Sequence, residues 1–413
     1  MNNKGNKLIN KVPQVTIFFW IIKVLCTTVG ETFADFLNVN LNFGLTGTSV
    51  ALGILLLIAL FFQFRAKKYV PVIYWVTVVF ISVFGTLVTD ILTDSMGVPL
   101  ETSTIIFSIL LLLTFTFWYS KEKTLSIHSI YTPRREFFYW LTILFTFALG
   151  TASGDLMAES LGLGYLVTGI IVAVVIILVV IARQLKLNPV LSFWIIYIMT
   201  RPLGASIGDL LSQPTKYGGL GLGATLTSII FLLGILALVL YFTFSKRDVI
   251  TDPEIEDKKD KEEKGLILQA VITVMLFIII GGGAYYWRHN TVLKENEQPV
   301  LNTSQDSVQN PNKVQNQDKK IPLSPLGDLS SFIKITTDTR DLVVANNLAG
   351  AKTRVADLEY EWDNAQSRLK SKNGAKWTEV DDAIDKVLRS LRAVNPNQQD
   401  CLSSLDALLA VLK

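Results

Sequence analysis

Long apolar runs fill most of the first 287 residues of this 413-residue chain, and charged residues gather in the short stretches between them. A helix of about 20 apolar residues crosses the ~30 Å hydrocarbon core of a bilayer. Runs of this kind recur nine times, so the pattern predicts nine membrane spans. Their ranges are about 13–35, 46–64, 70–94, 101–119, 137–159, 163–183, 189–211, 220–244 and 265–287.

The pattern changes after the ninth span. Residues 288–324 are rich in Asn, Gln, Lys, Asp and Pro, which is typical of a flexible linker. Within 325–413 apolar residues return at helical spacing, as at Val355, Leu358 and Trp362. We expect a small soluble four-helix bundle here, with Asn395 as the N-cap of its last helix.

The first eight spans form four tandem pairs, at 13–64, 70–119, 137–183 and 189–244. The first span of each pair carries a short motif that ends in an acid, and the second span is plainly apolar. The motifs are Cys26-Thr27-Thr28-Val29-Gly30-Glu31, Gly85-Thr86-Leu87-Val88-Thr89-Asp90, Gly150-Thr151-Ala152-Ser153-Gly154-Asp155 and Gly204-Ala205-Ser206-Ile207-Gly208-Asp209. Because each pair crosses the membrane twice, the four repeats share one orientation and are parallel.

Steps of four residues from each acid stay on one face of the helix. The faces read Lys23, Thr27, Glu31 and Asp35; Ser82, Thr86, Asp90 and Asp94; Phe147, Thr151, Asp155 and Glu159; and Arg201, Ala205, Asp209 and Gln213. Charged groups that face lipid are costly, so we expect these faces to line the interior of the bundle.

We predict that Glu31, Asp90, Asp155 and Asp209 bind a cation or relay protons. Thr27, Thr86 and Thr151 are the expected supporting ligands. Lys23 and Arg201 are the expected charge modulators, with direct contact to a substrate or an anion as their alternative role. A structural role for the acids, in hydrogen bonds between helices or pairing with those two cations, is the alternative. Asp35, Asp94 and Glu159 are further candidate ligands, although polar residues at helix ends often only meet water.

Small residues occupy the neighbouring face of each motif span. They include Gly30, Gly85, Gly150, Gly154, Gly204 and Gly208. Small residues four apart let membrane helices approach closely, so this face should pack on other helices. Trp75, Trp140 and Trp194 each lie fifteen residues before an acid, and Trp20 lies eleven before one. We interpret these tryptophans as interfacial anchors.

Basic residues alternate between the loops and predict the topology. The loops after spans two, four, six and eight are basic, whereas the alternate loops carry only Lys216. By the positive-inside rule, residues 1–12 and the charged loop 245–264 are cytoplasmic. The ninth span then places the linker and the bundle outside the cytoplasm.

Composition narrows the function classes. Charged residues make up only 18% of the chain and hydrophobic residues 50%, which fits a polytopic all-α membrane protein. Two cysteines and two histidines give no disulfide framework and no histidine metal cluster, and there is no phosphate-binding loop. We therefore expect no cofactor, no enzymatic activity and no nucleic-acid partner.

Each of the four two-span units has a tryptophan early in its first span, and in three of them the motif ends in Gly-Asp or Gly-Glu. With these features the units resemble a known bacterial family. Its members are membrane-anchored proteins with four tandem repeats of unknown function. The resemblance covers residues 12–247 and leaves out the ninth span and the bundle. It implies the repeat fold and a location in the bacterial inner membrane.

The sequence thus favours an integral membrane carrier that is specific for a hard cation or coupled to protons. Carboxylate and hydroxyl oxygens suit protons and hard cations better than soft metals. The alternative is a membrane-anchored sensor or interaction protein that binds an extracytoplasmic protein partner through residues 325–413.

Overall fold

The computed structural model describes residues 10–37, 44–96, 98–212, 219–248, 265–297, 324–370, 372–393 and 396–413. Helices dominate this part of the chain. In the membrane part they are α1 (Ile17–Asp35), α2 (Gly44–Arg65), α3 (Pro71–Asp90), α4 (Leu100–Glu122), α5 (Pro133–Asp155), α6 (Gly164–Gln184), α7 (Pro189–Ser212), α8 (Gly223–Ser245) and α10 (Leu266–Glu297). Three short elements join them: the π-helical turns η2 (Ile91–Ser95) and η4 (Leu156–Ser160) and the 3₁₀ turn η3 (Ile127–Ser129).

Nine of the described helices are long and apolar enough to cross a membrane, as the sequence predicts. Proline begins α3, α5 and α7, where its fixed φ suits the first helical turn and its missing N–H costs nothing. The ninth helix runs to Glu297, past its predicted end at 287. The linker prediction is therefore wrong for residues 288–297, and residues 298–323 lie outside the described part.

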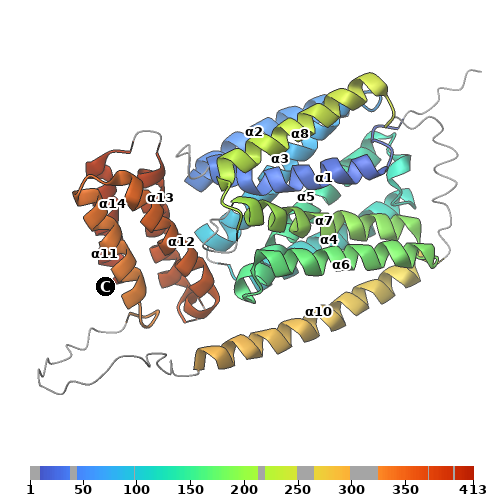
Figure 1. The fold of residues 1–413 in the computed structure, drawn as a ribbon. Helices are drawn as coiled ribbons and strands as arrows, with labels where there is room; N and C mark the ends of the chain where they lie inside the picture. The colour runs from blue at the N-terminus through green and yellow to red at the C-terminus, as the bar shows by residue number, and fades with distance from the viewer. Residues whose placement is uncertain are drawn as a thin grey trace, which may run out of the picture.

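The four motif helices form a closed inner ring. α1 packs on α3, α3 on α5, α5 on α7, and α7 on α1 (Figure 1). The plainer helices lie outside this ring, and each packs on the motif helix of the next repeat: α2 on α3, α4 on α5 and α6 on α7. α8 closes the cycle by packing on α1.

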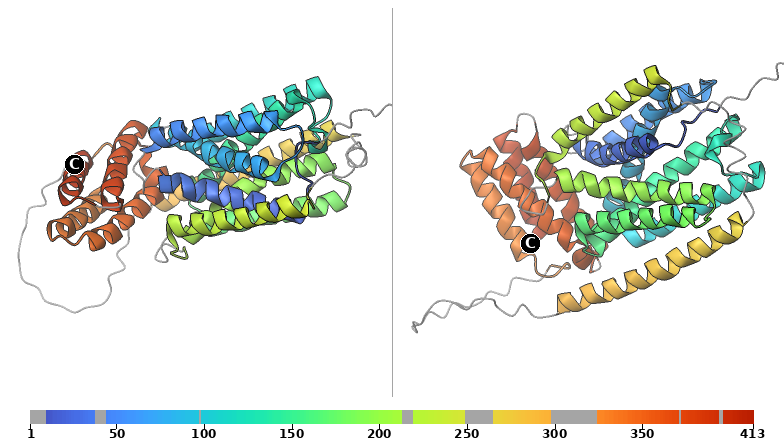
Figure 2. Two further views of the ribbon diagram at one scale, coloured as in Figure 1. Left: turned by 90° about the horizontal axis from the view of Figure 1, so that it is seen from above. Right: turned by 45° about the vertical axis from the view of Figure 1, so that its right-hand side comes forward.

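Burial follows these two layers. Between 56% and 72% of the residues in each inner span are buried, against 17% to 28% in the outer spans. The outer helices are apolar all round, as suits helices in contact with lipid. α10 is 6% buried and lies alongside the ring near α6 and α7 (Figures 1 and 2).

Aromatic residues fill the N-terminal end of the ring. Trp75, Trp140 and Trp194 are 2–4% exposed and pack with Tyr74, Tyr139 and Tyr197 in one core cluster. The prediction of interfacial anchors is wrong for these three tryptophans. Fifteen residues are close to four helical turns, so each tryptophan points to the same inner side as its acid.

The C-terminal helices form the expected four-helix bundle. They are α11 (Ser330–Val344), α12 (Leu348–Lys370), α13 (Gly374–Arg392) and α14 (Gln398–Leu412). The last helix begins later than predicted, because Asn397 is its N-cap and accepts hydrogen bonds from the N–H groups of Gln399 and Asp400. The bundle stands at the C-terminal end of the ring, where α12 contacts η4 and α13 contacts η2 (Figure 2).

Candidate functional site

Glycines bring the motif helices of the ring close together. A methyl group on Gly30 of α1 would lie 2.0 Å from Ser82 Oγ of α3, and one on Gly85 of α3 would lie 2.7 Å from Phe147 Cβ of α5. Such distances leave no room for a side chain. At these two interfaces the missing side chain is therefore what lets the backbones approach.

The other two interfaces of the ring follow the same rule. A methyl group on Gly150 of α5 would lie 2.4 Å from Arg201 Cγ, and one on Gly204 of α7 would lie 1.7 Å from Thr27 Oγ1. Gly154 and Gly208 have looser neighbours, at 3.4 Å and 3.3 Å. Gly150 thus provides the space in which the Arg201 side chain enters the ring.

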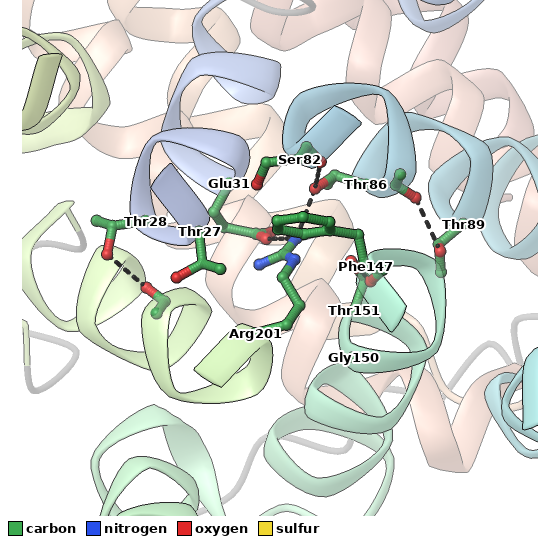
Figure 3. Close-up of polar contacts among 12 residues, drawn as sticks. Thr27, Thr28, Glu31, Ser82, Thr86, Thr89, Phe147, Gly150, Thr151 and Arg201 are labelled. Carbon is green, nitrogen blue, oxygen red and sulfur yellow. Dashed lines mark hydrogen bonds and ion pairs between the residues drawn. The ribbon is translucent and has the colours of Figure 1, made fainter. Parts of the chain in front are cut away.

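Arg201 is the central residue of the ring interior (Figure 3). Its side chain is fully buried, and its Nη2 donates to Glu31 Oε2 at 2.6 Å and to Thr86 Oγ1 at 2.5 Å. One guanidinium therefore joins three of the four motif helices: α7, α1 and α3. The Glu31 side chain is 14% exposed, so the pair is buried on the arginine side and partly open on the carboxylate side.

Several buried donors around this pair have no hydrogen-bond partner among the described residues. They are Arg201 Nε and Nη1, Lys23 Nζ, Ser82 Oγ and Tyr197 Oη. Lys23 Nζ lies 3.9 Å from the ring centroid of Phe147 and 4.3 Å from that of Tyr197, so aromatic faces are its neighbours.

Lys23, Ser82, Phe147 and Arg201 are equivalent positions of the four repeats, each eight residues before the motif acid. The ring therefore contains one layer with two cations, one serine and one phenylalanine. We call this set, together with Tyr197, the donor layer.

The three threonines differ in what they bind. Thr86 accepts from Arg201 and donates to the carbonyl of Ser82. Thr27 donates to the carbonyls of Val24 and Thr200, and Thr151 to that of Phe147. Among the hydrogen bonds of the described residues, Thr86 is thus the predicted supporting ligand that contacts a charged group.

The motif acids lie at different depths. Asp209 is 8% exposed, Asp90 and Asp155 are partly exposed, and each of the three makes at least one interaction. η2 follows Asp90 and η4 follows Asp155. Within the described residues no three His, Cys, Asp or Glu side chains gather where they could hold one metal ion. The side chains of Asp35, Asp94 and Glu159 lie outside the described part, as does Gln213.

A second buried ion pair escaped the sequence analysis. Lys11 Nζ donates to Glu136 Oε2 at 2.6 Å and to the carbonyl of Phe64, and Gln63 Nε2 donates to Glu136 Oε1 at 3.0 Å. Glu136 is fully buried. Among the described motif helices, Glu136 is the one acid in a first helical turn. That unusual position is the feature of the sequence from which the ion pair could have been suspected.

Backbone contacts fix the same N-terminal segment. The N–H of Lys11 donates to Ile130, that of Gln14 donates to Asp248, and Asn10 accepts from Tyr69. Residues 10–14 therefore tie the loops together at the N-terminal end of the ring. Tyr69 also donates to Asp248 Oδ2 at 2.5 Å, and burial raises the pKa of the Asp248 carboxyl.

These features define a multi-pass helical membrane protein in which four tandem two-helix repeats form an inner and an outer ring. The sequence matches the family described as Repeat of Unknown Function (DUF347) four times, at residues 18–69, 73–124, 138–185 and 192–248. The matches cover just over half of the chain, which belongs to this family. No curated protein and no solved structure matches this chain.

Proposed function

We propose that this protein is a proton-coupled membrane carrier whose translocation path runs through the ring interior. One observation carries the proposal: Arg201 is fully buried inside the ring and joins α7 to Glu31 of α1 and Thr86 of α3. Charged side chains are rare inside membrane spans and commonly mark ion or substrate pathways. Because the Glu31–Arg201 pair and Thr86 link three helices, a change in the charge of the pair would change how these helices pack.

Glu31 is the proton site in this mechanism. Its carboxylate accepts from Arg201 of α7, which also donates to Thr86 of α3, and 14% of the Glu31 side chain is exposed. Protonation removes the charge that holds Arg201, which weakens the contact between α7 and α1. The ring can then change its packing when Glu31 gains or loses a proton.

The two ends of the ring differ, which supports alternating access. Buried aromatic rings and the Lys11–Glu136 pair close the N-terminal end, which we assign to the cytoplasmic side by the positive-inside rule. Glu31 lies one turn before the C-terminal end of α1. This conformation corresponds to a state that is closed toward the cytoplasm.

The proton suits this site better than a hard metal cation. Mg²⁺ and Ca²⁺ bind through several oxygen ligands, whereas Glu31 already accepts from a guanidinium. The role of Asp90, Asp155 and Asp209 in binding a cation stays a prediction, and the transport assay includes divalent cations for that reason.

The test is transport by the purified protein in proteoliposomes that contain a pH-sensitive dye. Gradients of small organic anions, organic cations and divalent metal ions are imposed in turn. A coupled solute should change the internal pH with the wild type and with Glu101→Gln, but not with Glu31→Gln. Glu101 is a matched control because it is a partly buried acid of an outer helix, α4, with a hydrogen bond from Tyr285. Equal pH changes in Glu31→Gln and the wild type would refute the assignment.

The second candidate is a membrane-anchored sensor that acts through the bundle. The observation in its favour is the contact of α12 with η4 and of α13 with η2, the turns that follow Asp155 and Asp90. Deleting residues 298–413 separates the two. A carrier retains its flux without the bundle, whereas a sensor loses its partner.

A further inference from the structure

The donor layer of the ring has more hydrogen-bond donors than acceptors. Lys23 and Arg201 can only donate, and three of the five N–H bonds of Arg201, on Nε and Nη1, have no partner among the described residues. Ser82 Oγ and Tyr197 Oη are also buried without a partner. Buried donors of this kind cost free energy, and a ligand that supplies acceptors would recover it.

These donors belong to one layer of the ring. Lys23, Ser82 and Arg201 occupy equivalent positions of three repeats, and the ammonium of Lys23 lies over the ring of Tyr197. Figure 3 shows the Arg201 guanidinium between the helices that carry Glu31 and Thr86, with Ser82 one turn from Thr86.

Charge points to a monoanion as the ligand. With the Lys23 amine protonated, Lys23 and Arg201 are two cations, and Glu31 is the carboxylate that Arg201 binds. Before Glu31 takes up its proton, these three groups together leave one positive charge. A carboxylate carries one negative charge and has two oxygens that can accept several hydrogen bonds at once. The rings of Phe147 and Tyr197 offer apolar surface for a short hydrocarbon tail.

We infer that the donor layer binds a small monocarboxylate, which is the substrate of the carrier. This inference rests on the proposed function and names its substrate class. Lys23, Ser82, Tyr197 and the free N–H groups of Arg201 hold the carboxylate, and Glu31 holds the proton that moves with it. The substrate keeps all its covalent bonds; an O–H bond forms on the Glu31 carboxylate when it takes up the proton and breaks when the proton leaves on the other side.

The test measures binding directly, without transport. Purified full-length protein is titrated with sodium acetate at constant ionic strength, and the fluorescence of the buried tryptophans next to this layer is recorded; Trp194 lies 5.6 Å from Tyr197 between ring centroids. Acetate should give a saturable change. Sodium chloride and sodium phosphate should give none.

Two tyrosines provide a matched pair of variants. Tyr197→Phe removes a buried hydroxyl that has no partner, whereas Tyr74→Phe removes one that is hydrogen-bonded to Tyr139. Tyr197→Phe should raise the acetate Kd about tenfold, because it removes one hydrogen bond to a charged group. Tyr74→Phe should leave the Kd unchanged.

Lys23→Met provides a second readout that does not depend on affinity alone. It removes a buried cation without a hydrogen-bond partner, so the variant should unfold at a higher temperature than the wild type when acetate is absent. Acetate should stabilise the wild type and not this variant. A merely structural role of Lys23 would lower the unfolding temperature instead.

The inference is overturned if folded wild-type protein shows no saturable response to acetate, or if Tyr197→Phe and Lys23→Met bind acetate as the wild type does. Equal responses to chloride or phosphate would overturn the assignment to carboxylates. Acetate binding without acetate transport in proteoliposomes would support the site and contradict the carrier. Proton-coupled transport of another solute, without acetate binding, would support the carrier and contradict the carboxylate site.

Discussion

At the scale of single residues, the sequence identifies the polar face of each motif helix but not the partners on it. Pairing of the acids with Lys23 and Arg201 is the alternative that the sequence offers, yet Glu31 and Arg201 lie 170 positions apart and nothing in the sequence selects this pair. The pairing needs the ring to bring α7 beside α1 and needs Gly150 to make room for the arginine. Sequence likewise could not predict that Lys23 Nζ has no hydrogen-bond partner among the described residues, because this depends on how the helices pack around it.

The Glu31–Arg201 pair should show strong coupling in a double-mutant cycle. Glu31→Gln or Arg201→Met alone leaves a buried charge without its partner, which typically costs about 3–5 kcal/mol. The double variant should be more stable than the sum of the single effects predicts, by at least about 1 kcal/mol. Thermal unfolding in detergent, followed by tryptophan fluorescence, measures all four proteins. Additive effects would show that the two side chains do not interact.

At the scale of elements, hydrophobic runs predict the helices well. The bounds of the first eight spans differ by only a few residues from those of the structure, whereas the ninth helix runs to Glu297, past its predicted end at 287. The order of the helices around the ring could not be predicted. Each outer helix packs on the next repeat, and α8 returns to α1, because the ring is closed in space and not in sequence. The burial of the tryptophans follows from this closure, since three further helices surround each inner face.

Gly150→Ala should destabilise the ring, and Gly281→Ala should not. The added methyl group at 150 meets Arg201 Cγ at 2.4 Å, and overpacking of this kind costs about 1–3 kcal/mol. Gly281 in α10 has nothing within 4 Å of the added carbon, so alanine there is neutral or stabilising by about 1 kcal/mol through helix propensity. Unfolding temperatures in detergent compare the two; equal losses would mean that close packing at Gly150 does not stabilise the ring.

Two of the ion pairs at the N-terminal end, Lys11–Glu136 and Arg134–Glu122, should differ sharply in strength. Lys11→Met leaves the fully buried Glu136 without its cation and should cost about 3–5 kcal/mol. Arg134→Met removes a side chain that is 67% exposed and lies 3.6 Å from Glu122, so it should cost at most about 1 kcal/mol. The free energy of unfolding of each variant tests this, and a similar loss in both would argue against a structural role of residues 10–14.

At the scale of the whole molecule, the repeats place all motif helices in one direction and gather their C-terminal ends beneath the bundle. The bundle has its own apolar core, built around residues such as Trp362, Val380 and Leu405. It therefore has the packing of an independent domain. Sequence predicted this division because apolar periodicity returns after residue 325, but it gave no sign that α12 and α13 contact the turns after Asp155 and Asp90.

The loop between α2 and α3 and the C-terminal residue Lys413 should lie on opposite sides of the membrane. Lys67 and Lys413 are both exposed and stand at opposite ends of the membrane helices, so cysteine at either position is open to reagents from one side only. In cells with Cys26→Ala and Cys401→Ala, a membrane-impermeant thiol reagent should label Lys413→Cys from outside and should label Lys67→Cys only after lysis. Labelling of both in intact cells would contradict the topology.

The proton role of Glu31 is tested most directly by comparing net flux with exchange for the solute that changes the internal pH in proteoliposomes. Net flux requires a proton to arrive and leave, whereas exchange of labelled for unlabelled solute at equal concentrations does not. The account predicts that Glu31→Gln loses net flux and the accompanying pH change but retains exchange, while Glu101→Gln retains both. Retention of net, proton-coupled flux by Glu31→Gln would contradict it.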